Sequence, residues 1–177
     1  MNIKSVVMFS GLCLSAYACN NSTSEQQRED KTEITHLVDS FTYSKDSATL
    51  PGFEIEVQLS KKAEDTLKAL HESVIVKAYF SGIPKDTTSE EYEEMGYISI
   101  GDHEIELRDV RMAKFMHIAL SRKDIELLKD KNFEVLINVF SGHRATDVNL
   151  LNVDILQKSI DSVAGKHFVL KGKLIGE

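Results

Sequence analysis

The sequence has no tryptophan, two prolines and two cysteines among its 177 residues. Tryptophan is the best side chain for stacking on a flat apolar ring face, so its absence weakens the case for a glycan-binding surface. The nucleophile elbow G-x-S-x-G and the phosphate-binding patterns G-x-G-x-x-G and G-x-x-x-x-G-K are also missing. We therefore expect a protein without a bound cofactor and without catalytic activity.

Basic residues are outnumbered, with 21 Lys and Arg against 28 Asp and Glu, and the formal net charge is −7. Nucleic-acid binding is disfavoured, because a phosphate backbone attracts positively charged surfaces. An acidic protein is instead suited to a basic protein partner, whose encounter is accelerated by complementary charge.

The first residues have the pattern of an export signal. Lys4 precedes the apolar stretch 6–14, which is too short to span a bilayer and fits the core of a secretory signal. The stretch ends in Ala16-Tyr17-Ala18-Cys19, with small residues two positions apart before the cysteine. This end resembles the lipobox of bacterial lipoproteins. The resemblance implies cleavage after residue 18 and acylation of Cys19, so that the mature protein reaches the membrane through a lipid anchor. The alternative is an ordinary signal peptide cut near Ala18.

This reading divides the chain into a signal over residues 1–18, a polar tether over 19–33 and one domain over 34–177. Removing the signal also removes the charge of Lys4 and changes the net charge from −7 to −8. The only other cysteine, Cys13, lies within the signal, so no disulfide is expected inside a mature chain. Asn20, rather than Asp, follows Cys19. In the bacterial lipoproteins that this signal resembles, Asp at this place marks retention in the inner membrane, so the resemblance implies the outer membrane of the bacterial envelope.

The domain has the pattern of a β protein. Phe53–Leu59 alternates apolar and polar residues, while 73–80 and 132–140 are rich in β-branched and aromatic residues. Residues 97–107 predict a hairpin that turns at Gly101-Asp102. Further strands are expected at 34–43, 110–120, 150–156 and 168–175, and capped helices are expected after Ser60 and Ser121. About eight strands with two short helices on their connections favour an antiparallel, immunoglobulin-like β-sandwich.

Two segments are candidates for binding a partner. The run from Asp86 to Glu94 has five acids among nine residues, with Tyr92 in the middle as a possible aromatic anchor. The second segment is the loop 141–147 after an apolar strand, and we expect the two to share one end of the sandwich. The candidate residues are Asp86, Glu90, Glu91, Tyr92, Glu93, Glu94, His143 and Arg144.

Polar residues in the strands leave a second interpretation open. Glu54 with Glu56, and Glu104 with Glu106, are two residues apart, as are any neighbours on the solvent face of a strand. The six histidines lack a metal-ligand spacing, and His117 is interpreted as a partly buried ring within an apolar strand. We expect no metal site, but side chains distant in sequence, such as His103 and His143, could still converge.

The leading hypothesis is a lipid-anchored envelope protein with a non-enzymatic, protein-binding role, either in an assembly or as an inhibitor. Lipid-anchored inhibitors of lysozyme present an S-G-x-x-Y loop to a basic enzyme, but neither Ser81-Gly82 nor Ser141-Gly142 continues to that tyrosine. One alternative is an envelope enzyme or metal-binding protein that uses scattered histidines and carboxylates. Another is a binder of small ligands or glycans, which should show a deep apolar or tyrosine-lined pocket.

Overall fold

The computed structural model describes residues 41–177, of which 46% lie in strands and 19% in helices. The prediction of a mainly β fold is therefore confirmed. The predicted signal, the tether with Cys19, and the first part of the strand expected from residue 34 lie outside the described residues. In chain order the elements are β1 (Thr42–Tyr43), β2 (Ser47–Thr49), β3 (Phe53–Leu59), α2 (Lys61–Leu70), β4 (Val74–Gly82), α3 (Glu90–Met95), β5 (Ile98–Leu107), β6 (Met112–Phe115), β7 (Ala119–Ser121), α4 (Arg122–Leu127), β8 (Glu134–Ser141), β9 (Leu151–Val153), β10 (Leu156–Ser159), α5 (Ile160–Val163) and β11 (His167–Leu174).

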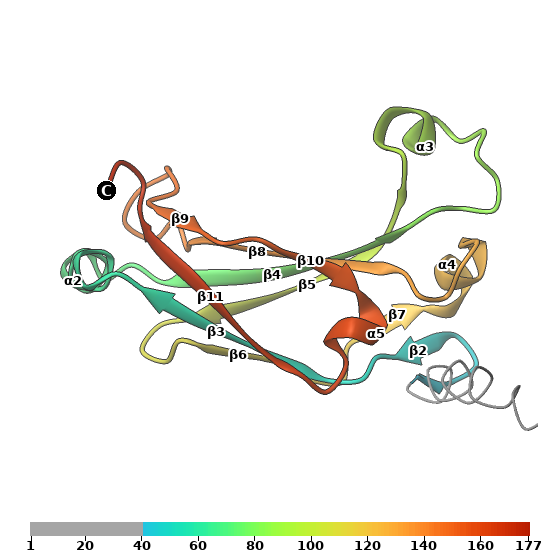
Figure 1. Ribbon diagram of the computed structural model, residues 1–177, viewed down its shortest axis with the longest axis horizontal. Helices are drawn as coiled ribbons and strands as arrows, with labels where there is room; N and C mark the ends of the chain where they lie inside the picture. Colours follow the sequence, from blue (N-terminus) through green and yellow to red (C-terminus); the bar gives the residue numbers. More distant parts are fainter. Residues whose placement is uncertain (1–40) are drawn as a thin grey trace, which may run out of the picture.

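Two four-stranded sheets contribute most of the core. Their strand orders are β10-β8-β4-β5 and β6-β3-β11-β9, and a small third sheet has the order β1-β2-β7 (Figure 1). The alternation in β3 buries Phe53, Ile55 and Val57, which join one apolar cluster with Val76 and Ile137 of the other large sheet. One strand pair departs from the expected antiparallel arrangement, because β3 and β11 run parallel.

The two predicted helices are present with their predicted caps. The Ser60 hydroxyl accepts a hydrogen bond from the Ala63 amide at 3.1 Å and begins α2, and the Ser121 hydroxyl accepts one from the Asp124 amide at 3.4 Å and begins α4. Two further helices, α3 and α5, were not expected from the sequence. None of the helices within residues 41–177 is both long and apolar enough to cross a membrane.

The predicted hairpin at 97–107 is wrong, because these residues form the single strand β5. The strand pairs with β4 from Leu107 opposite Val74 to Ile98 opposite Gly82. Gly101 has a φ of +138°, but it lies where the register shifts by one residue and forms a bulge instead of a turn. β4 supplies backbone hydrogen-bonding partners along the whole length of β5. These bonds favour one continuous strand over a hairpin that turns at Gly101.

The strand expected over 110–120 is divided into β6 and β7. His117 lies between them with a φ of +57°, and this left-handed residue moves the chain from the sheet of β3 to the sheet of β2. Its side chain is exposed, so the interpretation of His117 as a partly buried ring in a strand is wrong. The apolar neighbours had suggested burial, but only those that point into the core are buried.

Candidate functional site

The two predicted binding segments lie at opposite ends of the sheet, which makes the prediction of a shared end wrong. In the antiparallel pair of β4 and β8, Val74 faces Ser141. The loop after Ser141 therefore leaves beside the start of β4, whereas the acidic run follows the end of β4. Figure 1 shows the same separation, with α3 at one end of the molecule and α2 and β9 at the other.

The acidic run belongs to a long connection between β4 and β5, and we call residues Ile83–Tyr97 the acidic connection. Its second half is the helix α3, where an exposed loop was expected. The helix is capped by Ser89, whose hydroxyl accepts a hydrogen bond from the Tyr92 amide at 3.3 Å, and Gly96 ends it with a φ of +75°. Its acids Glu90, Glu91 and Glu93 lie in the first turn, where negative charge is favourable for a helix.

The carboxylates of the acidic connection are not neutralised by bases. Among residues 41–177, the ion pairs involve carboxylates elsewhere, and none involves the five acids from Asp86 to Glu94. Two of the five accept local hydrogen bonds, Asp86 from Thr88 and Glu91 from the Ser99 amide at 2.7 Å. The hydrogen bond from the Thr88 hydroxyl also lowers the pKa of Asp86, which keeps this carboxyl charged. The acidic connection therefore presents a concentrated negative charge to solvent.

Tyr92 takes a different position from the exposed anchor that the sequence suggested. It is half-buried and packs against the core, so that much of its ring holds α3 to the domain. The large apolar side chains exposed in the acidic connection are instead Ile83, Met95 and Tyr97.

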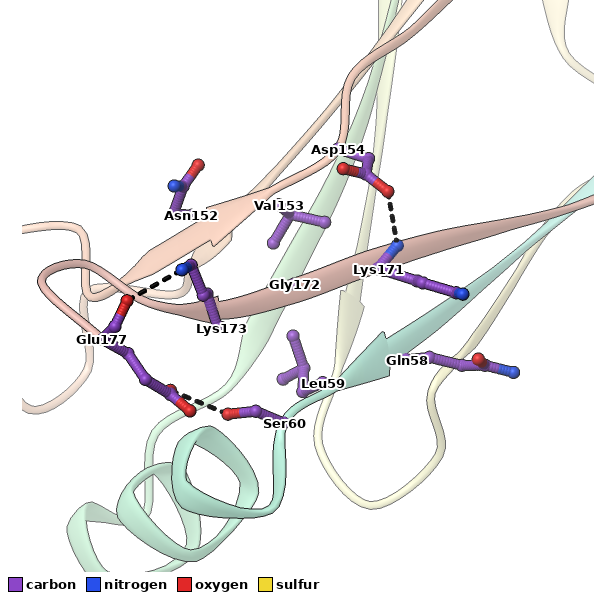
Figure 2. A pocket seen from close by; sticks show the side chains of 10 residues that line it. All are labelled: Gln58, Leu59, Ser60, Asn152, Val153, Asp154, Lys171, Gly172, Lys173 and Glu177. Carbon is purple, nitrogen blue, oxygen red and sulfur yellow. Dashed lines mark hydrogen bonds between the residues drawn. The ribbon is translucent and has the colours of Figure 1, made fainter.

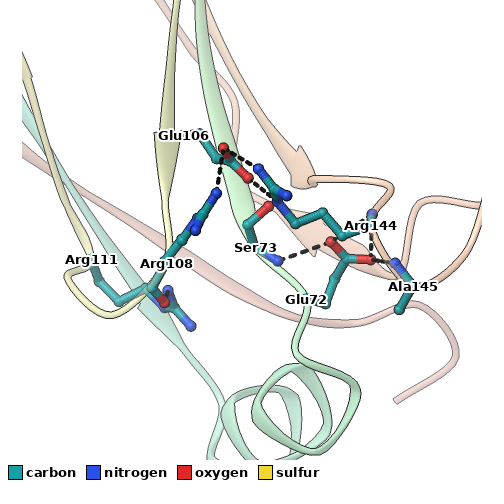
Figure 3. A network of polar contacts seen from close by, with 7 residues as sticks. All are labelled: Glu72, Ser73, Glu106, Arg108, Arg111, Arg144 and Ala145. Carbon is teal, nitrogen blue, oxygen red and sulfur yellow. Dashed lines mark hydrogen bonds and ion pairs between the residues drawn. The ribbon is translucent and has the colours of Figure 1, made fainter.

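The second candidate segment is held by a buried carboxylate, and we call residues Gly142–Leu150 the clamped loop. Glu72 is 5% exposed and accepts backbone N–H bonds from Ser73, Arg144 and Ala145 at 2.9, 3.0 and 2.8 Å (Figure 3). Burial by itself raises the pKa of Glu72, but these three N–H donors, Ala145 first, outweigh burial and lower it. The charged Glu72 therefore fixes the start of the loop against the beginning of β4.

The guanidinium of Arg144 provides a second attachment. Its Nη2 donates to Glu106 Oε2 at 2.7 Å, and its Nε donates to the other oxygen of the same carboxylate. The Arg144 guanidinium is the main cause that lowers the pKa of Glu106 to about 2, and the pair also raises the pKa of Arg144. The sequence suggested Arg144 as a contact for a partner. In the structure its backbone N–H bonds to Glu72 and its guanidinium bonds to Glu106, so both groups hold the loop in place. Nothing in the sequence marked Glu72, because a single glutamate after a helix gives no sign that it is buried.

Ser141, at the end of β8, and His143, in the clamped loop, have separate partners. The hydroxyl of Ser141 accepts from the Leu150 amide at 2.9 Å, and the Ser141 amide donates to Asn149 Oδ1, which closes the base of the loop. His143 lies instead beside Phe140, with ring centroids 6.1 Å apart. His103 is on β5 and contacts Phe115, so the two histidines lie in different surroundings.

One histidine does lie between carboxylates. His167 Nε2 is 3.1 Å from Glu56 Oε2, and its Nδ1 is 3.6 Å from Glu54 Oε2, while Lys114 pairs with Glu54 at 3.0 Å. The two carboxylates approach different ring nitrogens, so the three groups do not point to a common centre. Within residues 41–177 no three His, Cys, Asp or Glu side chains are arranged to hold a metal ion.

An open hollow of about 510 Å³ lies over the ends of β3, β9 and β11 (Figure 2). Leu59 and Val153 close over Gly172, where a Cβ would come within 2.8 and 2.6 Å of them. Part of the polar rim is bonded internally, since Ser60 donates to the Glu177 carboxylate at 2.8 Å. The hollow is neither apolar nor lined by tyrosine, and its lining residues are Gln58, Leu59, Ser60, Asn152, Val153, Asp154, Lys171, Gly172, Lys173 and Glu177.

Comparisons with known proteins add no family to this description. No family model matches the chain, and neither the curated proteins nor the solved structures gave a significant match.

Proposed function

We propose that this chain is a lipid-anchored, non-enzymatic binding protein of the bacterial envelope, whose acidic connection recruits a protein with a basic surface. The length of the acidic connection carries the proposal. Neighbouring antiparallel strands need only about two to five residues between them, whereas 15 residues, 83–97, join β4 to β5. Long connections on a rigid scaffold commonly serve binding.

The charge of the acidic connection supports a basic partner. Its five carboxylates lack ion-pair partners among the described residues, so their field extends into solvent. The base of the acidic connection is also fixed, because the Lys85 amide donates to Leu127 O and the Lys129 amide donates to Ile83 O, both at 2.8 Å. A fixed base reduces the entropy that binding must overcome.

Capture from envelope extract tests the partner. The protein carrying Glu90→Gln, Glu93→Gln and Glu94→Gln should capture much less of a basic protein than the unaltered chain, and the difference should disappear at high salt. The matched control changes three exposed acids elsewhere, Asp46→Asn, Asp109→Asn and Asp147→Asn, and should capture normally. Equal capture by both triple variants would count against recruitment by the acidic connection.

The lipid anchor follows from the signal at the start of the chain. Replacing Cys19→Ser removes the sulfur that would carry the acyl chain, and hydrocarbon burial supplies the membrane affinity. The unaltered protein should fractionate with outer membranes, and the Cys19→Ser protein should not. Unchanged fractionation of the variant would contradict the anchor.

We also propose that the two large sheets have an immunoglobulin-like arrangement. Two four-stranded sheets that contribute to one apolar core support this comparison of architecture. An experimental structure superposed on immunoglobulin domains tests it, and a different strand order around the core would contradict it.

A further inference from the structure

We propose that the hollow over the ends of β3, β9 and β11 binds a small organic carboxylate, and that the side chain of Glu177 occupies the anion subsite of this hollow in the structure. The site is separate from the acidic connection, because α2 and β9 lie at the other end of the molecule from α3 (Figure 1). The volume of the hollow, about 510 Å³, is typical of pockets that hold small ligands.

The anion subsite is defined by the groups that hold the Glu177 carboxylate. Its Oε2 accepts hydrogen bonds from the Ser60 hydroxyl at 2.8 Å and from the Leu174 amide at 3.1 Å. The bond from Ser60 is the main cause that lowers the pKa of Glu177, followed by the bond from Leu174. The positive charges of Lys62 and Lys173 act in the same direction. Two donors and two bases therefore surround one carboxylate.

Glu177 reaches this subsite through a tight turn after β11. The Glu177 amide donates to Leu174 O at 3.2 Å, and Gly176 has a φ of +85°, which glycine adopts at no steric cost. Glu177 is exposed, and the neighbouring Ile175 is 61% exposed. Few contacts are lost when the side chain moves away, so a carboxylate from solution can compete for the same donors.

An apolar floor lies beside the subsite. Leu59 at the end of β3 and Val153 at the end of β9 lie on either side of Gly172 (Figure 2). A Cβ at position 172 would come closer than 3.0 Å to both side chains and would push them apart. The glycine therefore keeps two aliphatic groups together, and the apolar part of a ligand can bury surface against them.

Charge favours an acid as the ligand. With Glu177 displaced, the acid that remains in the lining is Asp154, whose carboxylate accepts the Lys171 amide at 3.2 Å. The bases beside the hollow are Lys62, Lys171 and Lys173. Three bases against one acid give a locally positive surface on a chain with a net charge of −7, which favours an anion over a cation or a neutral ligand.

Titration of hexanoate into the mature chain tests the proposal, with Cys19→Ser in every sample to keep the protein in solution. Nuclear magnetic resonance follows the amides of Gly172 and Leu174, and hexanol and acetate are the comparison ligands. Hexanoate should bind at least about tenfold more tightly than either, because hexanol lacks the charge and acetate lacks the apolar chain. Equal binding of hexanol would overturn the anion subsite, and equal binding of acetate would overturn the apolar floor.

Replacing Glu177→Ala removes the competing carboxylate. The affinity for hexanoate should rise about tenfold, as expected if the subsite is free about a tenth of the time in the unaltered chain. Glu94→Ala is the matched control, because this exposed glutamate of α3 gives the same change in net charge at the other end of the molecule. Its affinity should stay unchanged. Equal affinities of the two variants would overturn the role given to Glu177.

The Leu174 amide gives a readout that a general effect on stability would not produce. Its signal should shift in the Glu177→Ala variant, because the acceptor is lost. Saturating hexanoate should return the signal towards its position in the unaltered chain, because a carboxylate again accepts the bond. A Leu174 signal that hexanoate leaves in place would overturn the proposal.

Lysine variants locate the charge, each made in the Glu177→Ala chain. Lys62→Gln with Lys173→Gln should weaken hexanoate binding at least about threefold. Lys123→Gln with Lys129→Gln makes the same change in charge at exposed positions away from the hollow and should not weaken it. Equal affinities of the two double variants would overturn the subsite. Recruitment by the acidic connection would stand in every case, because its test uses a different surface.

Discussion

At the scale of single residues, Glu72 is the one charged side chain among residues 41–177 that is buried. A buried carboxylate is costly unless hydrogen bonds compensate for its lost hydration, and here three backbone N–H groups do so. Glu72 joins the end of α2 to a loop more than 70 residues away. Nearby, the pair of Arg144 and Glu106 ties the same loop to β5. The start of the clamped loop is therefore held by two carboxylates, Glu72 and Glu106.

Replacing Glu72→Gln should destabilise the domain by about 2 kcal/mol. Glutamine keeps the size of the side chain but removes the charge and turns an NH₂ group towards backbone donors. Urea unfolding measures the change. Asp147→Asn, at an exposed position in the same loop, should change the free energy of unfolding by less than about 0.5 kcal/mol. Similar stabilities for the two variants would contradict the role given to Glu72.

The free energy of unfolding of the domain should decrease as the pH is lowered through the acidic range. The pKa values of Glu72 and Glu106 are lower in the folded protein than the ordinary value of 4.5, with that of Glu106 at about 2. The unfolded state therefore binds more protons, and the stabilisation by these groups is fully present above about pH 4.5 and is lost as the pH falls towards 2.

Urea unfolding at a series of pH values checks this dependence. Glu106→Gln removes one of the two groups and should make the decrease between pH 4.5 and 2 shallower, while leaving the dependence above pH 6 unchanged. An identical decrease in the variant would show that other carboxylates are responsible.

At the scale of elements, the sequence was most informative where a local interaction begins an element. The caps at Ser60 and Ser121 were predicted because a hydroxyl bonds to an amide only three residues away. The sequence did not predict the single strand β5. Its extended form depends on pairing with β4, a separate segment, and local sequence patterns do not specify the register of that pairing. Similarly, α3 was missed because five acids suggested a solvated loop, although Ser89 and Gly96 were in place to cap a helix.

The Ser60 cap gives a prediction at this scale. Ser60→Ala should cost about 1 kcal/mol of folding free energy, because the Ala63 amide loses its acceptor at the start of α2. The Ser159 hydroxyl, which precedes α5, bonds to the Ser162 hydroxyl at 2.8 Å but makes no capping bond to a backbone amide. Ser159→Ala is therefore the control, because it removes a contact between two hydroxyls and no cap, and it should cost clearly less. Chemical unfolding of the two proteins compares them directly, and an equal loss of stability would show that the capping bond contributes little.

At the scale of the whole molecule, a single apolar core formed by both large sheets accounts for the stability of the described domain. The chain has cysteine only at positions 13 and 19, so residues 41–177 contain no disulfide. Small exported domains commonly depend on disulfides for stability. A domain of this length buries enough apolar surface to be stable without them.

If Cys19 is acylated as proposed, the protein should therefore unfold at the same temperature with and without a thiol reductant. Calorimetry or circular dichroism on the purified chain measures this. A lower unfolding temperature in the reduced sample would indicate a disulfide between chains through Cys19, and would also contradict complete acylation of that residue.

The sequence alone determined the β class, the strand β3 and two helix starts, because alternation of side chains and capping hydrogen bonds act over a few residues. It also provides the whole case for the proposed lipid anchor at Cys19, which lies outside the described residues. The tertiary structure decided which polar groups face each other. It separated the acidic connection from the clamped loop, assigned Arg144 to Glu106 and buried Glu72. These pairings join residues tens of positions apart, and their partners are set by strand register and by the order of strands in the sheet, which local sequence patterns do not specify.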